Sequence, residues 1–151
     1  MHLILAIKTE AMKLMKYNYL ELSKQGSIAA LVLRVTFGGF LLYGHGIGKV
    51  GRLFGDEPIK FLDFIGLGAP LSLALATGAE VIGSLMIMVG LFTRFASAPV
   101  IFTLCVAAFL VHGGDGFSGQ EKLFLYIMGF VAILITGPGK YSIDGYLSKS
   151  R

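Results

Sequence analysis

The 151-residue sequence contains one cysteine, no tryptophan and few charged side chains. Because Cys105 is alone, an intrachain disulfide, a CxxC redox pair and a thiolate metal cluster are excluded. Charged residues make up 15% of the chain, whereas ordinary soluble domains have about 25%. A soluble domain of this length could bury a core, but this sequence supplies too few polar residues to cover it.

Several functional motifs are also missing. The segment Gly44-His-Gly-Ile-Gly-Lys is rich in glycine, but it lacks the preceding strand and the Ser or Thr of a phosphate-binding loop. No G-x-S-x-G nucleophile pattern, flavin motif or nicotinamide motif is present. The net charge of +4 includes no basic cluster interleaved with aromatics, so we expect no nucleic-acid partner. We also expect no metal site, because catalytic zinc needs three good ligands.

Long apolar blocks are the main positive feature. Hydrophobic residues make up 55% of the chain and the mean hydropathy is +0.77, which indicates a membrane protein. We predict an all-α fold, an integral membrane four-helix bundle surrounded by lipid. The expected spanning helices cover residues 27–44, 70–91, 95–111 and 121–136.

The remaining segments are expected to lie at the membrane surface. Residues 1–26 predict either an N-terminal amphipathic helix or a frayed, partly artificial extension, and they show no good cleavable signal. Asp56-Glu57-Pro58 predicts the start of a short interfacial helix between spanning helices one and two. Residues 112–120 are rich in glycine and predict an irregular loop. The expected organisation is therefore a surface segment at 1–26, a four-helix domain at 27–147 and a tail at 148–151.

The distribution of basic residues predicts the orientation. Eight lysines and arginines fall on the side of the termini and four fall on the other side. Since basic residues concentrate in the cytoplasm, both termini are predicted to be cytoplasmic, in a plasma (inner) membrane.

Two charged residues fall inside the predicted spans, Arg34 and Glu80. An ionised carboxylate in the middle of a bilayer is costly unless it is paired or protonated. Arg34 is long enough to reach Glu80, so we expect an ion pair, with Thr77 and Ser84 completing the hydrogen bonds of Glu80. This pair either fixes the helix register or forms a proton or ligand site; alternatively, Glu80 faces lipid or a partner subunit.

A second group of polar residues is expected at the outer end of the bundle. Arg34, Gly38, Leu41 and His45 share one helix face at the expected spacing, with Lys49 one turn further out. His45, Lys49, His112 and Glu121 are then expected to gather at one mouth. They are either solvated, or form an anion or quinone headgroup site. The two histidines are also candidate axial ligands of haem b.

The sequence resembles the DoxX/DoxD family of small four-helix membrane proteins. The resemblance covers residues 28–147 and rests on Arg34, the segments Gly44-His45-Gly46 and Gly90-Leu-Phe-Thr-Arg94, Glu80, His112, Phe117, Glu121 and the closing Gly137-Pro-Gly-Lys-Tyr-Ser-Ile-Asp144. It implies a plasma-membrane oxidoreductase subunit, and relatives of DoxD resemble the membrane part of a thiosulfate:quinone oxidoreductase.

The resemblance therefore implies a subunit of a quinone-linked or sulfur-linked redox system. The candidate catalytic residues are Glu80, His45 and His112, and the candidate ligand-binding residues are Arg34, Lys49 and Glu121. A bound quinone or a soluble redox partner subunit would carry the electrons, and a homo-oligomer is a further expectation. The alternatives are a non-catalytic scaffold or assembly subunit and a small proton-coupled transporter that uses Glu80.

Overall fold

The computed structural model describes residues 22–64 and 66–149. The amphipathic helix expected at the N-terminus lies outside these residues. The described part contains helices and connecting segments and no strand. The elements are α2 (Lys24–Leu41), η1 (Leu42–Gly46), α3 (Ile47–Leu53), α4 (Ala69–Val89), α5 (Thr93–Val106), η2 (Ala107–Val111), α6 (Gly116–Thr136) and α7 (Ile143–Lys149).

Four helical segments in the described residues are long and apolar enough to cross a membrane. They are Lys24–Leu53, Ala69–Val89, Thr93–Val111 and Gly116–Thr136. The first has 30 residues because η1 and α3 continue the helix beyond its expected end at residue 44. The prediction of an all-α membrane protein with four spanning helices is confirmed.

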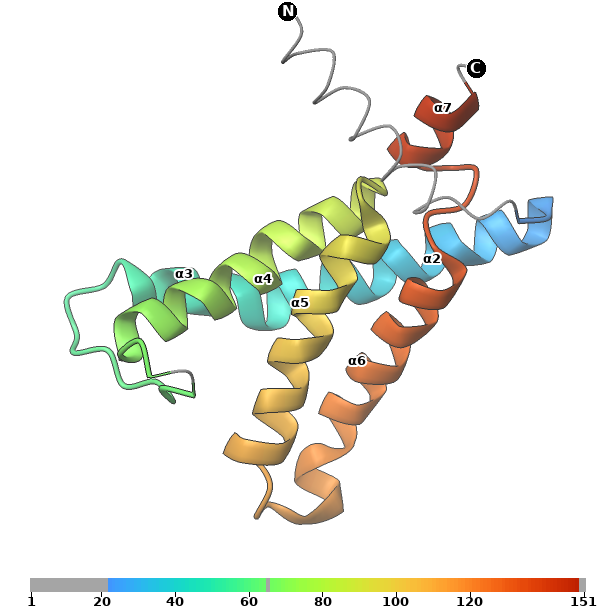
Figure 1. Cartoon of the computed structure of the whole chain (residues 1–151). Coiled ribbons are helices and arrows are strands. Elements are labelled where there is room, and N and C mark those ends of the chain that lie inside the picture. Colours follow the sequence, from blue (N-terminus) through green and yellow to red (C-terminus); the bar gives the residue numbers. More distant parts are fainter. Residues whose placement is uncertain (1–21, 65, 150–151) are drawn as a thin grey trace, which may run out of the picture.

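The four spans pack in a closed order. Helix α5 contacts both α4 and α6, and α2 also contacts both α4 and α6. Figure 1 shows that the helices converge near the α4–α5 turn, where α7 also lies, and diverge toward α3 and toward the turn between η2 and α6. These last two regions are therefore well separated in space.

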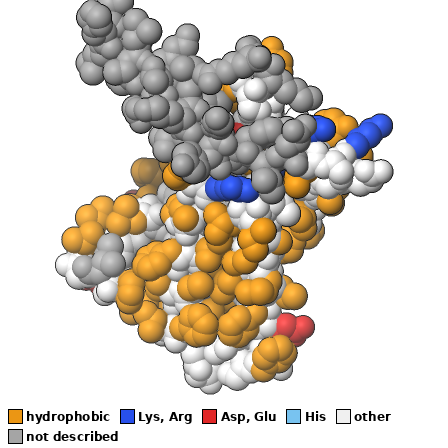
Figure 2. Space-filling view, turned by 45° about the vertical axis from the view of Figure 1, so that its right-hand side comes forward, with side chains coloured by type: hydrophobic (Ala, Val, Ile, Leu, Met, Phe, Trp, Pro, Cys, Tyr) orange, Lys and Arg blue, Asp and Glu red, His pale blue; other side chains and the backbone are white. Residues whose placement is uncertain are grey.

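Apolar side chains both fill the bundle and cover its surface. The buried core contains Leu41, Ile87, Val100, Leu104, Phe130 and Ile133 among others. Many large apolar side chains are nevertheless exposed, including Phe40, Phe102 and Met128. Figure 2 shows one face on which hydrophobic side chains cover the middle of the molecule. In water this surface would be unfavourable, so it fits a lipid environment.

Two spans contain a π-helical turn. In η1 the Ile47 N–H bonds to the Leu42 carbonyl, and after η2 the His112 N–H bonds to the Ala107 carbonyl at 2.9 Å. Each of these bonds spans five residues, so each turn holds one residue more than an α-helical pattern would. The side chains that follow are rotated relative to an ideal α-helix.

The connecting segments differ from expectation in two places. The short interfacial helix expected after residue 55 is absent from the described residues of the α3–α4 loop. In this loop Asp63 accepts hydrogen bonds from the Leu67 N–H, the Gly68 N–H and the Ser72 hydroxyl, each at 2.9 Å. Its carboxylate thereby organises a turn before α4. In addition, α6 begins at Gly116, within the expected loop at residues 112–120.

Candidate functional site

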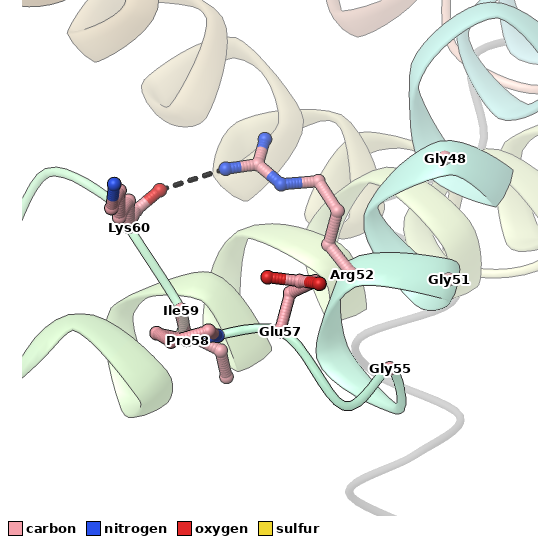
Figure 3. A pocket seen from close by; sticks show the side chains of 8 residues that line it. All are labelled: Gly48, Gly51, Arg52, Gly55, Glu57, Pro58, Ile59 and Lys60. Carbon is pink, nitrogen blue, oxygen red and sulfur yellow. Dashed lines mark hydrogen bonds between the residues drawn. The ribbon is translucent and has the colours of Figure 1, made fainter.

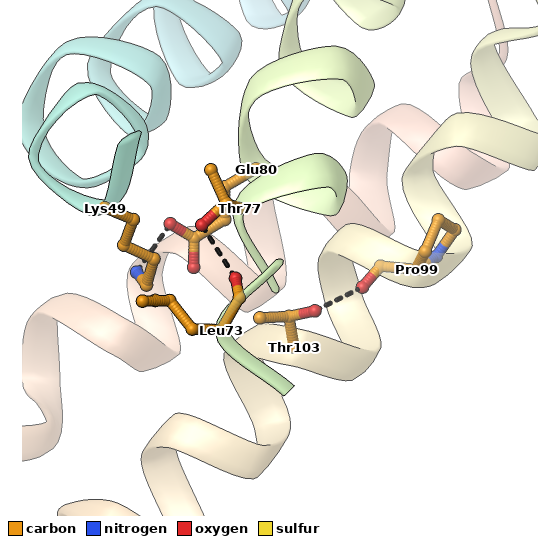
Figure 4. A network of polar contacts seen from close by, with 6 residues as sticks. All are labelled: Lys49, Leu73, Thr77, Glu80, Pro99 and Thr103. Atoms are coloured by element: carbon orange, nitrogen blue, oxygen red, sulfur yellow. Dashed lines mark hydrogen bonds and ion pairs between the residues drawn. The ribbon is translucent and has the colours of Figure 1, made fainter. Parts of the chain in front are cut away.

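An ion pair between a partly buried lysine and a buried glutamate joins the first two spans. Nζ of Lys49, on α3, lies 2.6 Å from Oε2 of Glu80, on α4. The exposed fractions of these side chains are 18% for Lys49 and 4% for Glu80. Figure 4 shows the two side chains pointing toward each other across the space between their helices. Since a lone ion is costly inside a bilayer, each charge stabilises the other.

Small residues set the register of these helices. A methyl group on Gly38 would crowd Met88, and one on Gly46 would lie 3.0 Å from Val81 and 3.6 Å from the Glu80 carbonyl. Residues near 46 on the first span are thus level with Glu80 on the antiparallel α4. Lys49 follows within one turn and reaches the carboxylate.

The predicted Arg34–Glu80 ion pair is wrong. Arg34 is fully buried, and its Nη1 donates to the carbonyls of Ile87 at 3.2 Å and Met88 at 3.1 Å. Its Nη2 donates to the Tyr141 carbonyl at 2.6 Å. Glu80 lies seven or eight residues before these α4 carbonyls, or about 11 Å along the helix. Arg34 is long enough to reach a carboxylate at a similar level, but the packing register of the two helices separates the two charges.

Neither of the two hydroxyl groups expected to support Glu80 bonds to its carboxylate. Thr77 donates from Oγ1 to the Leu73 carbonyl at 2.7 Å, one turn back in its own helix. The Ser84 Oγ is buried and has no hydrogen-bond partner. Lys49, and neither of these hydroxyl groups, therefore donates the hydrogen bond to the carboxylate of Glu80.

Arg34 belongs to a second polar cluster at the opposite end of α4. Its guanidinium stabilises the C-terminal carbonyls of α4, where the helix dipole favours a cation. Asp144, on α7, accepts hydrogen bonds from the N–H groups of Phe92 at 3.0 Å and Thr93 at 3.2 Å, where α5 begins and an anion is favoured. Burial raises the pKa of Asp144, while these N–H groups and the charge of Arg34 oppose that rise. This cluster holds the α4–α5 turn and is structural.

His45 lies beside the Lys49–Glu80 pair. The face expected from α-helical spacing would have turned His45 inward after Leu41, but the π turn places Gly46 there instead. The His45 ring packs edge-on against Tyr126 of α6, with ring centroids 5.8 Å apart and planes at 89°. Lys49, Glu80 and Lys122 are all within electrostatic range of the imidazole. Tyr126 and Lys122 were not among the residues predicted from the sequence, because their place beside His45 depends on how α6 packs against the first span.

His112 does not join this group, so the four residues expected at a common mouth are not gathered there. His112 Nδ1 lies 2.6 Å from Oδ2 of Asp115, within the turn between η2 and α6. Figure 1 shows that turn apart from η1 and α3. Glu121 is exposed near the start of α6. The helices diverge toward α3 and toward the η2–α6 turn. The prediction of a common mouth assumed that the spans stay parallel up to these ends.

The candidate site is therefore defined by His45, Lys49, Glu80 and Tyr126, with Lys122 at its edge. It offers an imidazole, an ammonium, a carboxylate and a phenol at one level of the membrane span. These groups can exchange protons and donate hydrogen bonds to an acceptor oxygen. Within residues 22–64 and 66–149, no three His, Cys, Asp or Glu side chains are grouped so as to hold a metal ion.

A comparison with protein families decides the classification. The DoxX family model matches residues 29–113, more than half of the chain. The chain belongs to the DoxX family. The matched region of this DoxX protein includes the candidate site residues His45, Lys49 and Glu80, whereas Tyr126 and Asp144 follow it.

Curated relatives extend the similarity to most of the chain. The inner membrane protein YqjF of Escherichia coli (strain K12) is 29% identical over 133 residues, which cover 85% of this chain and 98% of that protein. An uncharacterised protein of Haemophilus influenzae (strain Rd) is 29% identical over 139 residues, covering 87% of this chain and 98% of that protein. A second uncharacterised protein of the same strain is 25% identical over 85 residues, and that match covers only 56% of the relative. No solved structure matches this DoxX protein.

Proposed function

We propose that this DoxX protein is the membrane subunit of a quinone-linked or sulfur-linked redox system, and that it binds a quinone headgroup at His45, Lys49, Glu80 and Tyr126. The buried Lys49–Glu80 ion pair is the observation that carries the proposal. A scaffold helix pair is packed more simply with apolar residues, because burying two charges gives little net stability. Retaining a titratable pair in the span favours a role in proton exchange.

The chemistry requires both electrons and protons. Reduction of a quinone takes two electrons and two protons, and gives a quinol whose two oxygens each carry one proton. We assign the electrons to a soluble partner subunit that oxidises a reduced sulfur compound, since this chain has only one cysteine. His45 and the Lys49–Glu80 pair would supply the protons. A donated hydrogen bond from His45 or Lys49 would stabilise the negative charge that develops on a quinone oxygen.

The position of His45 supports this assignment. It lies in a π-helical turn, a feature that is frequent at functional sites. Its ring has the aromatic Tyr126 on one side and the ion pair nearby, so it borders both an apolar surface and a proton source. Quinone is preferred to haem b as the ligand, because the two histidines that would bind the iron have different partners, Tyr126 and Asp115.

The test is to measure quinone bound to the purified protein. The full chain would be purified from its membrane in mild detergent, and the quinone content per protein would be determined by lipid extraction and mass spectrometry. A short-chain naphthoquinone would then be titrated into quinone-free protein. We expect His45→Ala to weaken binding about tenfold, which corresponds to one lost hydrogen bond to a polar headgroup.

His112→Ala is the matched control, since it removes the same side chain outside the proposed site. It should leave quinone binding unchanged. Equal binding by wild type and His45→Ala, or no quinone in the wild-type protein, would refute the proposal. Copurification of a soluble partner without any quinone would favour the scaffold alternative, and proton uptake by quinone-free proteoliposomes would favour the transporter.

A further inference from the structure

A pocket lies at the end of the first span, away from the Arg34 cluster. It has a volume of about 290 Å³ and lies between α3 and the loop that follows it. Figure 3 shows Gly48 and Gly51 on the helix side of the pocket, and Glu57, Pro58, Ile59 and Lys60 on the loop side. Since Leu53 ends the membrane-spanning segment, the pocket lies where the hydrocarbon layer meets the headgroups.

Glycines leave room in this pocket. A methyl group built on Gly48 or Gly51 would have no atom within 4 Å, so neither glycine is required for close helix packing. Both are exposed and belong to the regular helix α3. The space beside them is therefore open to a ligand of headgroup size.

The charges around this space have both signs. Nη2 of Arg52 donates to the Lys60 carbonyl at 2.7 Å, so the guanidinium reaches across the pocket from the helix to the loop. The carboxylate of Glu57 points toward the Arg52 side chain. Arg52, Glu57 and Lys60 are all exposed. A ligand that pairs with all three charged side chains needs an anionic group for Arg52 and Lys60 and, a few ångströms away, a cationic group for Glu57.

Apolar side chains continue from the pocket along the span. Ile47 is 54% exposed and Phe54 is 82% exposed, and they lie just before and just after the residues of α3 that line the pocket. Exposed apolar groups beside a charged pocket match a molecule with a charged head and hydrocarbon tails.

We propose that this pocket binds the headgroup of phosphatidylethanolamine. The lipid phosphate binds the guanidinium of Arg52 and the ammonium of Lys60, and the ethanolamine ammonium donates to the carboxylate of Glu57. The acyl chains lie against Ile47 and Phe54. Phosphatidylglycerol offers the phosphate without a cation, and the choline group of phosphatidylcholine cannot donate a hydrogen bond. This site is independent of the quinone proposal.

Native mass spectrometry of the full-length protein tests this assignment. Delipidated protein in detergent would be titrated with phosphatidylethanolamine, phosphatidylglycerol and phosphatidylcholine of identical acyl chains. We expect phosphatidylethanolamine to bind about tenfold more tightly than the other two, because it alone makes the charge-assisted bond to Glu57. Glu57→Gln should remove this preference, whereas Arg52→Gln should weaken phosphatidylethanolamine and phosphatidylglycerol alike.

Filling the pocket gives a test that leaves its charges unchanged. Gly51→Leu should reduce binding of the first tight phosphatidylethanolamine, while Gly39→Leu, at another helical glycine with open space around it, should not. Thermal unfolding of the lipid-free variants would confirm that each is folded. Equal wild-type affinity for all three lipids, or an unchanged preference in Glu57→Gln, would overturn the proposal. Equally tight binding of soluble phosphoethanolamine would assign the pocket to a soluble phosphoester and overturn the lipid assignment.

Discussion

In the Lys49–Glu80 pair, a lysine supplies the counter-charge that a carboxylate needs inside a bilayer. The carboxylate of Glu80 is almost fully buried, but Lys49 keeps part of its side chain accessible near the end of its span. A lysine in that position can extend its ammonium toward the headgroups if its partner is lost. Loss of Glu80 is therefore expected to cost less stability than loss of Lys49.

Lys49→Met should destabilise the protein by about 3 kcal/mol, because it leaves the almost fully buried carboxylate of Glu80 without a counter-charge. The free energy of unfolding in mixed detergent micelles measures this loss. The double variant Lys49→Met with Glu80→Gln should recover much of the stability, since an uncharged pair of similar volume fills the same space. A double variant that is no more stable than Lys49→Met would show that the unpaired carboxylate is not the cause.

The sequence identified the polar residues of the spans but not their partners. Arg34, Glu80, His45 and Lys49 stand out because a charge or an imidazole in an apolar run needs a purpose. Their pairing depends on the register between two antiparallel helices, which close contacts at Gly38 and Gly46 determine. No local pattern specifies that register, and none marks the π turn that rotates His45 toward α6.

At the scale of elements, the α4–α5 turn is the most closely fitted connection. Gly90 ends α4 with a φ of 75°, and the N–H of Leu91 bonds back to the Met86 carbonyl at 2.9 Å. The Asp144 N–H also donates to the Gly90 carbonyl at 3.0 Å. A methyl group on Gly90 would collide with the Arg34 guanidinium and with Ser142.

Gly90→Ala should therefore lower the free energy of unfolding by about 2 kcal/mol or more, through backbone strain and overpacking. Gly78→Ala is the matched control within α4, where a methyl group meets nothing within 4 Å. That change should be neutral or stabilise by about 0.5–1 kcal/mol, because alanine favours a helix. Detergent-induced unfolding of both variants provides the measurement, and an equal effect of the two substitutions would contradict the assigned role of Gly90.

The turn before α4 should depend on pH. Hydrogen bonds, first from the Gly68 N–H and then from Ser72 and Leu67, lower the pKa of Asp63 against a smaller opposing effect of burial. A lowered folded-state pKa contributes stability above the unfolded-state value, and that stability is lost as the pH falls through the folded-state pKa, below about pH 4. Hydrogen-exchange protection of the Leu67 and Gly68 amides should fall in this window.

Substitution of Asp63 separates this effect from general acid unfolding. Asp63→Asn should show reduced protection of these amides already at neutral pH, whereas Asp56→Asn, in the same loop, should behave as wild type. If both variants retained wild-type protection, the carboxylate would not organise the turn. This role for Asp63 was hidden in the sequence, because Asp56-Glu57-Pro58 is also a common helix start and Lys60 and Asp63 have helical spacing.

At the scale of the whole molecule, apolar composition was the most reliable guide to the fold class and to the number of spans. Long hydrophobic runs must form helices in lipid, because only a helix or a closed barrel satisfies every backbone group there. Four spans could therefore be predicted without tertiary information. The divergence of the helices toward α3 and toward the η2–α6 turn could not, because side chains on lipid-facing and partner-facing surfaces are equally apolar.

The predicted topology can be checked on intact cells. The bond between Asp144 and Phe92 places α7 at the same end of the bundle as the α4–α5 turn. Since basic residues are more numerous at that end, this end should face the cytoplasm. In a Cys105→Ser background, a membrane-impermeant maleimide should label Asp56→Cys and Ser118→Cys, and should label Tyr146→Cys only after permeabilisation. The reverse pattern would invert the topology.

The bond from Arg34 to the Tyr141 carbonyl joins residues 107 positions apart in the chain. In a protein synthesised from its N-terminus, Arg34 enters the membrane long before Tyr141 and Asp144 leave the ribosome. The first span must therefore carry an incompletely satisfied guanidinium throughout insertion, and the last residues of the chain complete its hydrogen bonds. A nascent chain interrupted after α6 would keep that defect, which gives membrane quality control a way to distinguish an unfinished copy from a complete one.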